Sequence, residues 1–181
     1  MTEREIIEGC MRNDRICQKA LYTMFASRMK AISMRYLNNW QDANDVVQDG
    51  FLKIFTHVNE FNFEGPLEGW VKKTIINTAL TKMRRSDHNI ENDEFIEEEY
   101  DTTDFKDIVE RITVKNIRHE IARLPYGYRM VFNLYVVEGY SHKEIAETLK
   151  IQESTSRTQL AKARKMLQDR ITKSEIIHLN E

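Results

Sequence analysis

The sequence has little of the residues that interrupt helices, with two prolines and six glycines among 181 residues. Because Pro and Gly are the strongest local breakers of regular structure, this scarcity favours an all-α chain. No apolar run approaches the ~20 residues needed to cross a bilayer. The first residues, MTEREIIEGCMRND, are charged and lack the basic-then-apolar layout of a signal peptide. We therefore expect a cytoplasmic protein.

The sequence is also poor in residues that would support an enzyme site. Its two cysteines, Cys10 and Cys17, do not form a CxxC pair, so neither a disulfide framework nor a zinc site is supported. This usage is typical of a reduced compartment. The five histidines are scattered without metal-ligand spacing, and there is no glycine-rich phosphate loop or nucleophile motif. We expect no metal, no cofactor and no enzymatic activity.

The net charge of −2 conceals a strong segregation of charge along the chain. Residues 1–85 carry 13 basic and 10 acidic side chains, whereas residues 86–110 carry 11 acids against the single cation Lys106. Residues 111–139 and 140–173 are again mildly basic. The acidic segment has no sustained periodicity, which predicts a flexible, self-repelling linker between two basic domains. An alternative role is to mimic a polyanion in a basic channel.

A helix is predicted over residues 42–58, with Asp42 as its N-cap. One broad apolar face has to be buried in a core, and its members are Ala43, Val46, Val47, Phe51, Ile54, Phe55 and Val58. The opposite face holds one leucine among polar and acidic residues: Asp42, Asp45, Gln48, Asp49, Leu52 and Thr56. An exposed leucine among acids suits a basic partner surface with a hydrophobic centre. A solvated face with one stray apolar residue is the alternative.

A loop with two aromatic residues, 59–66, leads into a predicted helix over residues 67–85. The stripe expected to be buried contains Leu67, either Trp70 or Val71, Thr74, Ile75, Thr78 and Ala79. The other side is polar and basic, with Lys72, Lys73, Asn77, Thr81, Arg84 and Arg85. Cations in a last turn complement the helix dipole, but Lys73 and Asn77 lie in mid-helix. Cations beside aromatic rings are what a groove for single-stranded nucleic acid requires.

A helix-turn-helix is predicted near the C-terminus. Ser141 with Glu144 forms a capping box, residues 150–152 form the turn, and a second helix begins near Glu153. Its buried stripe is expected to be Ser156, Leu160, Ala163 and Leu167. The exposed side holds Ser154, Thr158, Ala161, Lys162 and Lys165, flanked by Arg157 and Arg164. A small, polar face edged by cations can enter a major groove, although an ordinary helical hairpin has the same outline.

The remaining segments are also predicted to be helical. Thr2 with Glu5 makes a capping box for a first helix. A second helix spans residues 16–37, with a possible break near residues 26–27 and a methionine stripe expected to fill the core: Met24, Met29 and Met34. Two further helices are expected over residues 112–123 and 130–137.

Three stretches, taken in order, resemble the extracytoplasmic-function (ECF) sigma factors, the small two-domain members of the bacterial sigma-70 family. The stretches are ALYTMFASRMKAISMRYLNNWQDANDVVQDGFLKIFTHVNEFN, GWVKKTIINTALTKMRR and LPYGYRMVFNLYVVEGYSHKEIAETLKIQESTSRTQLAKARKML. The resemblance implies two small helical domains, region 2 in residues 1–85 and region 4 in residues 112–173. A flexible acidic linker, 86–111, would join them, and residues 174–181 would form a tail.

The resemblance also implies a function: binding core RNA polymerase and directing promoter recognition and transcription initiation. Residues that match the segment docking on the clamp helices of the polymerase β′ subunit are Asp45, Gln48, Asp49 and Leu52. Matches to the single-stranded minus-ten site are Phe61, Phe63, Trp70, Lys72, Lys73, Asn77 and Arg84, with Asn77 beside a flipped base. Matches to the minus-thirty-five duplex site are Ser154, Thr155, Arg157, Thr158, Ala161, Lys162 and Lys165. The β flap and an anti-sigma factor are further implied partners.

Gln159 departs from the family pattern, because many members carry Arg or another residue at that position. Two other functions fit parts of the sequence. A repressor or activator that binds duplex DNA through the helix-turn-helix alone would leave Leu52 and the aromatic loop unexplained. A helical interaction protein without a nucleic-acid role is the second alternative, and failure to bind heparin or DNA at low salt would favour it.

Overall fold

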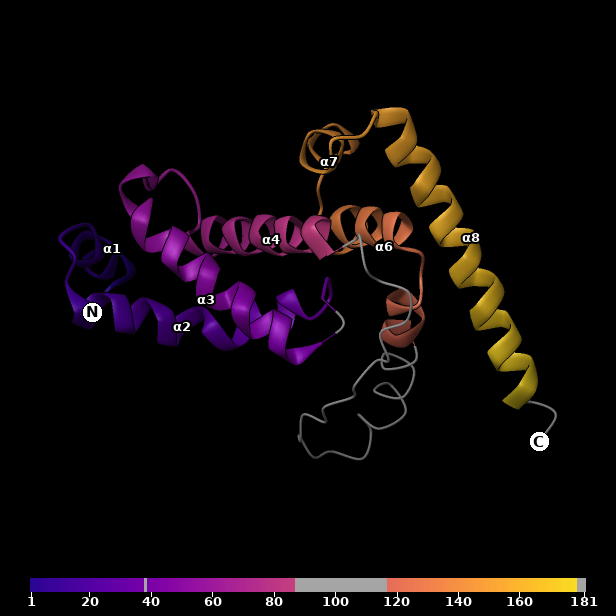
Figure 1. The fold of residues 1–181 in the computed structure, drawn as a ribbon, viewed down its shortest axis with the longest axis horizontal. Helices are drawn as coiled ribbons and strands as arrows, with labels where there is room; N and C mark the ends of the chain where they lie inside the picture. Colours follow the sequence, from indigo (N-terminus) through magenta and orange to yellow (C-terminus); the bar gives the residue numbers. More distant parts are fainter. Residues whose placement is uncertain (38, 87–116, 179–181) are drawn as a thin grey trace. The chain divides into compact units, whose positions relative to one another are not determined.

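A computed structural model of the chain describes residues 1–37, 39–86 and 117–178, and these residues form helices and turns with no strand (Figure 1). The all-α prediction is confirmed. The chain divides into two compact units, Met1–Ile96 (unit 1) and Glu97–Glu181 (unit 2). Apart from Ser86, the predicted linker lies outside the described residues. None of the described helices is long and apolar enough to cross a membrane.

Unit 1 contains α1 (Glu3–Met11), α2 (Arg15–Ser33), α3 (Trp40–Thr56), the short 3-10 segment η1 (Val58–Glu60) and α4 (Leu67–Ser86). Helices α2, α3 and α4 pack against one another, and α1 packs against α2 and η1. The apolar faces of these helices meet in one core, whose large, fully buried side chains include Ile7, Leu21, Met29, Tyr36, Phe51, Ile54, Ile75 and Leu80.

The N-terminal caps of unit 1 fix where its helices begin. The capping box of α1 is confirmed, since the Glu5 N–H donates to Thr2 Oγ1 at 3.2 Å and the Thr2 N–H donates to the Glu5 carboxylate at 2.8 Å. The predicted cap of α3 is wrong. Asn39 occupies that position, and its side-chain oxygen accepts from the Asp42 N–H at 2.7 Å. Asp42 therefore lies inside the first turn, where its charge complements the helix dipole.

The predicted break in the second helix is also wrong, because α2 runs without interruption from Arg15 to Ser33. Phe25 and Met29 are both buried on the same face, so the core continues past residues 26–27. Because Phe25 and Met29 are four residues apart, both pack into the core, and this packing keeps the helix intact between them. Met24 points away from that face and is exposed, which corrects its predicted place in the core.

Gly9 lets α1 approach α2 closely. A Cβ atom at Gly9 would lie 2.2 Å from Cys17 Sγ and 2.7 Å from Cys17 Cβ. We expect Gly9→Ala to lower the free energy of unfolding by about 1–3 kcal/mol, because the overpacked helices must move apart. Gly69→Ala on α4 is the matched control, since the nearest atom there is Pro66 Cγ at 3.5 Å. The control should be neutral or stabilise by up to about 1 kcal/mol.

Urea unfolding followed by circular dichroism measures both glycine variants. Equal midpoints for Gly9→Ala and Gly69→Ala would show that the contact between α1 and α2 tolerates a methyl group and would contradict the prediction.

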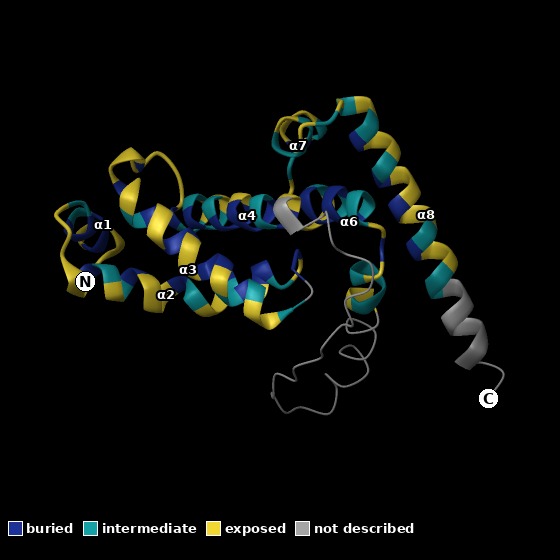
Figure 2. Cartoon of the chain, in the orientation of Figure 1, coloured by how far each residue is buried: buried dark blue, intermediate teal, exposed yellow. Residues whose placement is uncertain are grey.

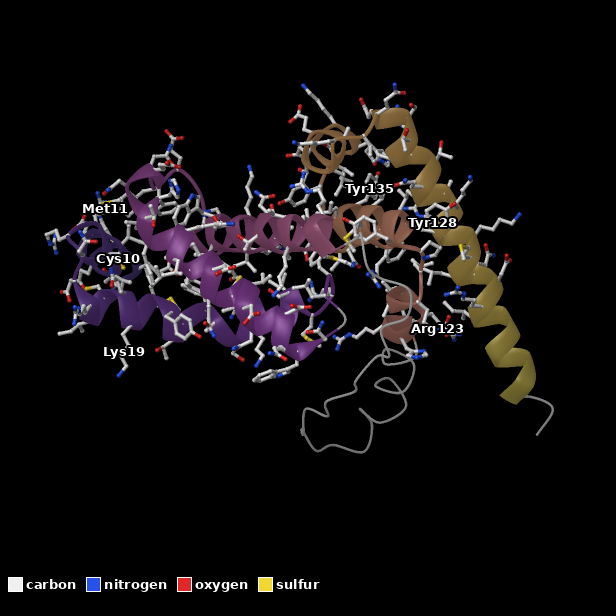
Figure 3. All side chains as sticks on the ribbon, in the orientation of Figure 1. Cys10, Met11, Lys19, Arg123, Tyr128 and Tyr135 are labelled. Atoms are coloured by element: carbon white, nitrogen blue, oxygen red, sulfur yellow. The ribbon has the colours of Figure 1, made fainter. Side chains whose placement is uncertain are left out.

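Both cysteines are buried in unit 1 as free thiols. Burial, with smaller contributions from the neighbouring Cys17 and Asp14, raises the pKa of the Cys10 thiol to about 11. Figure 3 shows Cys10 where α1 meets the rest of unit 1. Because the thiolate is the reactive form, Cys10 is chemically inert near neutral pH and belongs to the core.

Unit 2 contains a helical segment at residues 117–122, α6 (Tyr126–Phe132), the π-helical segment η2 (Asn133–Val137), α7 (His142–Leu149) and α8 (Glu153–His178). Leu124, Ala163 and Leu167 form a buried cluster against the middle of α8, and Ile121, Tyr128, Phe132 and Met166 pack against it. Figure 3 shows Tyr128 between α6 and α8. The buried Arg129 donates to the Ala122 carbonyl at 2.7 Å and holds α6 against the end of the preceding helix.

The predicted apolar helix over residues 130–137 differs from the structure in both its start and its burial. The helix begins earlier, at Tyr126, and its last turn is π-helical. This widening carries Val136 and Val137 to the surface, although Met130, Val131 and Leu134 are buried as expected. The prediction from the continuous apolar run therefore counted Val136 and Val137 as buried, although the buried face is narrower.

Candidate functional site

The outward face of α3 is the first candidate surface. Leu52 is 65% exposed, and Asp45, Gln48 and Asp49 are exposed around it at helical steps. The apolar side of the same helix is buried as predicted, except that Phe55 is only partly covered. Figure 2 shows these alternating buried and exposed bands on α3. Leu52 is therefore exposed to solvent at the C-terminal end of an acidic patch on α3, one turn after Asp49.

A lysine of α4 organises one end of this acidic patch. Lys82 Nζ lies 2.6 Å from the Asp42 carboxylate and 2.9 Å from the Asp45 carboxylate. The hydrogen bond from Lys82 lowers the pKa of Asp42, against the opposing effect of burial. Partial burial disfavours the charge on Lys82, but the two carboxylates outweigh it and raise the lysine pKa. Asp45 is therefore held in place by an ion pair with Lys82, whereas Asp49 is exposed one turn before Leu52.

Aromatic rings of the loop between η1 and α4 form the second candidate surface. The Phe61 ring centroid lies 5.1 Å from that of Phe63 and 5.5 Å from that of Trp70. Phe61 is only 7% exposed, whereas Phe63 is 40% exposed and has a left-handed backbone with φ of 62°. Of the two phenylalanines predicted to contact DNA, Phe63 is exposed and open to a ligand, whereas Phe61 is buried beside it as a support.

The polar side of α4 continues this surface as predicted. Lys73, Asn77 and Arg84 are exposed, and Lys72, Trp70 and Thr81 are half-buried. Of the two alternatives for the buried stripe, Val71 is the one in the core, so Trp70 lies at its edge. Thr81 Oγ1 donates to the Asn77 carbonyl at 2.7 Å and accepts from Arg84 at 3.4 Å. The Asn77 bond uses its backbone carbonyl, and the residue itself is exposed to solvent.

The helix-turn-helix of unit 2 is formed as predicted. The Ser141–Glu144 capping box starts α7, and Lys150 turns the chain in the left-handed conformation with φ of 57°. His142 Nδ1 lies 2.9 Å from Ser156 Oγ, and its ring stacks on Tyr135 at 4.5 Å between centroids. These contacts fix the first turn of α8 against α7. The geometry matches the arrangement that directs a second helix into a groove.

The outward face of α8 presents the predicted residues. The stripe of Ser156, Leu160, Ala163 and Leu167 is buried. The exposed residues are Ser154, Arg157, Thr158, Ala161, Lys162, Arg164 and Lys165, and Thr155 is half-buried. Arg157 forms an ion pair with Glu153 one turn earlier. Gln159, which departs from the family pattern, packs its side-chain amide against Gly127. A Cβ atom at position 127 would lie 2.9 Å from Gln159 Nε2.

Two contacts were missed from the sequence, those of Lys82 with α3 and of Arg4 with the aromatic loop. The Arg4 guanidinium lies 5.1 Å from the centroid of the Phe63 ring. Both contacts join residues far apart in the chain, so no local period could reveal them. The sequence contains one local indication of the Lys82 contact. Lys82 precedes the buried Met83, so part of its side chain lies against the core while its charged end reaches polar groups.

The chain matches two family patterns. The pattern described as Sigma-70 region 2 matches residues 21–89, and the pattern described as Sigma-70, region 4 matches residues 115–167. The first match contains α3, the aromatic loop and α4, and the second contains the helix-turn-helix. Together they cover the candidate surfaces of both units.

Individual proteins are similar over almost the whole chain. The ECF RNA polymerase sigma-E factor of Haemophilus influenzae is 24% identical over 186 residues, which cover 94% of this chain and 96% of that protein. The RNA polymerase sigma-H factor of Pseudomonas aeruginosa is 24% identical over 177 residues, with 91% of each covered. The structure of the sigma factor RpoE in complex with the anti-sigma factor NepR from Bartonella quintana has a TM-score of 0.56 at 19% identity, covering 85% of this chain and 96% of that one, and shows the fold.

Proposed function

The chain belongs to the sigma-70 family as an ECF sigma factor, and we propose that it binds core RNA polymerase and directs promoter recognition and transcription initiation. The observation that carries this proposal is Leu52, exposed on the acidic face of α3 one turn after Asp49. A large exposed apolar side chain next to carboxylates is the arrangement expected for docking on a basic surface with an apolar centre. The clamp helices of the β′ subunit are the proposed partner.

In unit 1, we assign the exposed loop and α4 to the non-template strand of the minus-ten element. Phe63 offers a ring on which an unstacked base can lie, and Lys73 and Arg84 offer charge to the phosphates. The amide of Asn77 can donate and accept hydrogen bonds at a base edge. The set is suited to single-stranded DNA because a paired base exposes neither its face nor its pairing edge.

In unit 2, we assign the exposed face of α8 to the major groove of the minus-thirty-five element. Thr158 and Ala161 are small enough for close approach to the base pairs, and Arg157 can bond to a guanine edge through two nitrogens. Lys162 and Lys165 are placed one turn apart beside them for phosphates. The buried contact between Ser156 and His142 keeps this face outward.

The free energy of base stacking indicates that promoter opening requires the complex with polymerase and not the sigma factor alone. Lost stacking costs about 1.4 kcal/mol for each melted base-pair step, whereas stacking one base on an aromatic ring returns about 1–3 kcal/mol. One captured base therefore offsets only one or two steps. We expect the free protein to bind promoter duplex weakly and to open none of it.

An anti-sigma factor is a further proposed partner. The solved relatives include a sigma factor bound to an anti-sigma factor, and the same exposed apolar residues that would contact polymerase or DNA are available to such an inhibitor. Binding there would exclude polymerase by competition.

Run-off transcription with bacterial core polymerase on a promoter library tests the proposed function. We expect defined transcripts when the full chain is added and none with core enzyme alone. A gel-shift series with promoter duplex, with and without core, accompanies it. Strong DNA binding together with no initiation at any promoter would instead favour a regulator that uses the helix-turn-helix alone.

A further inference from the structure

Arg4 lies against the ring that the proposed minus-ten site exposes. Its guanidinium carbon is 5.1 Å from the Phe63 ring centroid, within the range of a cation–π contact. Its side chain is 72% exposed, and its Nε donates to the Glu8 carboxylate at 3.0 Å. Helix α1, which supplies both Arg4 and Glu8, packs against η1 immediately before the aromatic loop. The N-terminal helix thus adds a cation to a surface otherwise built from the loop and α4.

The loop holds the Phe63 ring where Arg4 can meet it. A left-handed backbone is costly for a phenylalanine, and it persists here because the ring packs edge-on against the buried Phe61, which in turn rests on Trp70. The outer part of the ring is left to solvent and to the Arg4 guanidinium. A base that stacks on Phe63 would therefore arrive beside this cation.

Two carboxylates of α1 near Arg4 are already engaged. Glu8 bonds to Arg4 itself, and Glu5 accepts from the Thr2 N–H in the capping box. The Glu8 bond uses only Nε of the guanidinium. A phosphate can bond to the two terminal nitrogens as a bidentate partner, which is the geometry that arginine favours.

We propose that Arg4 is a further DNA-contacting residue of the minus-ten site: it lies over the Phe63 ring in the free protein and binds a backbone phosphate of the captured strand when a base stacks on that ring. This inference rests on the proposed function. It extends the single-strand site from the loop and α4 to the first helix of the chain.

The salt dependence of single-strand binding tests this proposal. Fluorescence anisotropy measures binding of short, fluorescein-labelled single-stranded oligonucleotides of random sequence to the complex of the full chain with core polymerase. One lost phosphate contact lowers the slope of log K against log salt by about 0.7, measured between about 50 and 200 mM salt. We expect this change for Arg4→Gln. Arg4→Lys should keep the slope, because the charge remains.

Arg12→Gln is the matched control, since Arg12 is an exposed arginine at the other end of α1. It should leave the slope unchanged, and circular dichroism confirms that each variant folds. An unchanged slope for Arg4→Gln, even with weaker binding at every salt concentration, would overturn the phosphate contact and leave Arg4 a support for Phe63. If the wild-type complex binds the oligonucleotides no better than core enzyme alone, the proposed function itself fails.

Discussion

Leu52→Arg is expected to abolish binding to core polymerase while leaving unit 1 folded. The Leu52 side chain is 65% exposed on α3, so its replacement removes no core packing. On the proposed partner, the leucine would fill an apolar contact that Asp45, Gln48 and Asp49 border on one side. An arginine there loses the apolar contact and places a cation against a basic surface.

The expected loss is at least about 2 kcal/mol, or about 30-fold in Kd, which is the usual effect at the centre of an interface. Fluorescence anisotropy of labelled sigma factor titrated with core enzyme measures it, and run-off transcription should fall in parallel. Ile16→Arg is the matched control, because Ile16 on α2 is a comparably exposed aliphatic residue, at 71%. The control should bind core polymerase as the wild type does.

Two results would count against this docking surface. Undiminished core binding by a folded Leu52→Arg would place the interface elsewhere on the chain. Equal losses from Leu52→Arg and Ile16→Arg would indicate a general penalty for added positive charge and no specific role for the acidic face.

The faces of the helices could be predicted from the sequence because burial repeats with the helical period. Val46, Phe51 and Ile54 on α3, and Ser156, Leu160 and Ala163 on α8, are buried as their spacing predicts. Once the buried face is known, the exposed one follows. This is why Leu52 and the cations of α8 could be assigned to a surface without any knowledge of tertiary packing.

Contacts between distant segments could not be predicted in the same way. Phe61 and Phe63 are alike in sequence, yet one is in the core and the other is exposed, and the backbone is extended at Phe61 but left-handed at Phe63. Arg4 contacts this loop only because α1 folds back against η1. The lysine bridge from α4 to Asp45 likewise depends on how two helices pack. A local period contains no information on such pairs.

Arg157→Ala is expected to weaken minus-thirty-five binding by about 1–3 kcal/mol and to relax specificity at one base pair. The Arg157 side chain is 62% exposed on the outer face of α8, and its partner in the free protein is Glu153 one turn away. An exposed ion pair of this kind contributes little to stability, so the guanidinium can exchange the carboxylate for a base edge at small cost. The variant should therefore fold normally.

A binding series on promoter duplexes, each substituted at one position of the minus-thirty-five element, separates base reading from phosphate contact. For Arg157→Ala in complex with core polymerase, the penalty for substitution should disappear at one position and persist at the others. Lys162→Ala is the matched control, because an exposed lysine on the same face is assigned to a phosphate and should weaken all sequences alike. If Arg157→Ala also weakens every duplex equally, then Arg157 binds the DNA backbone. The bases would then be read by the hydroxyl and methyl groups of Thr158 and Ala161 on α8.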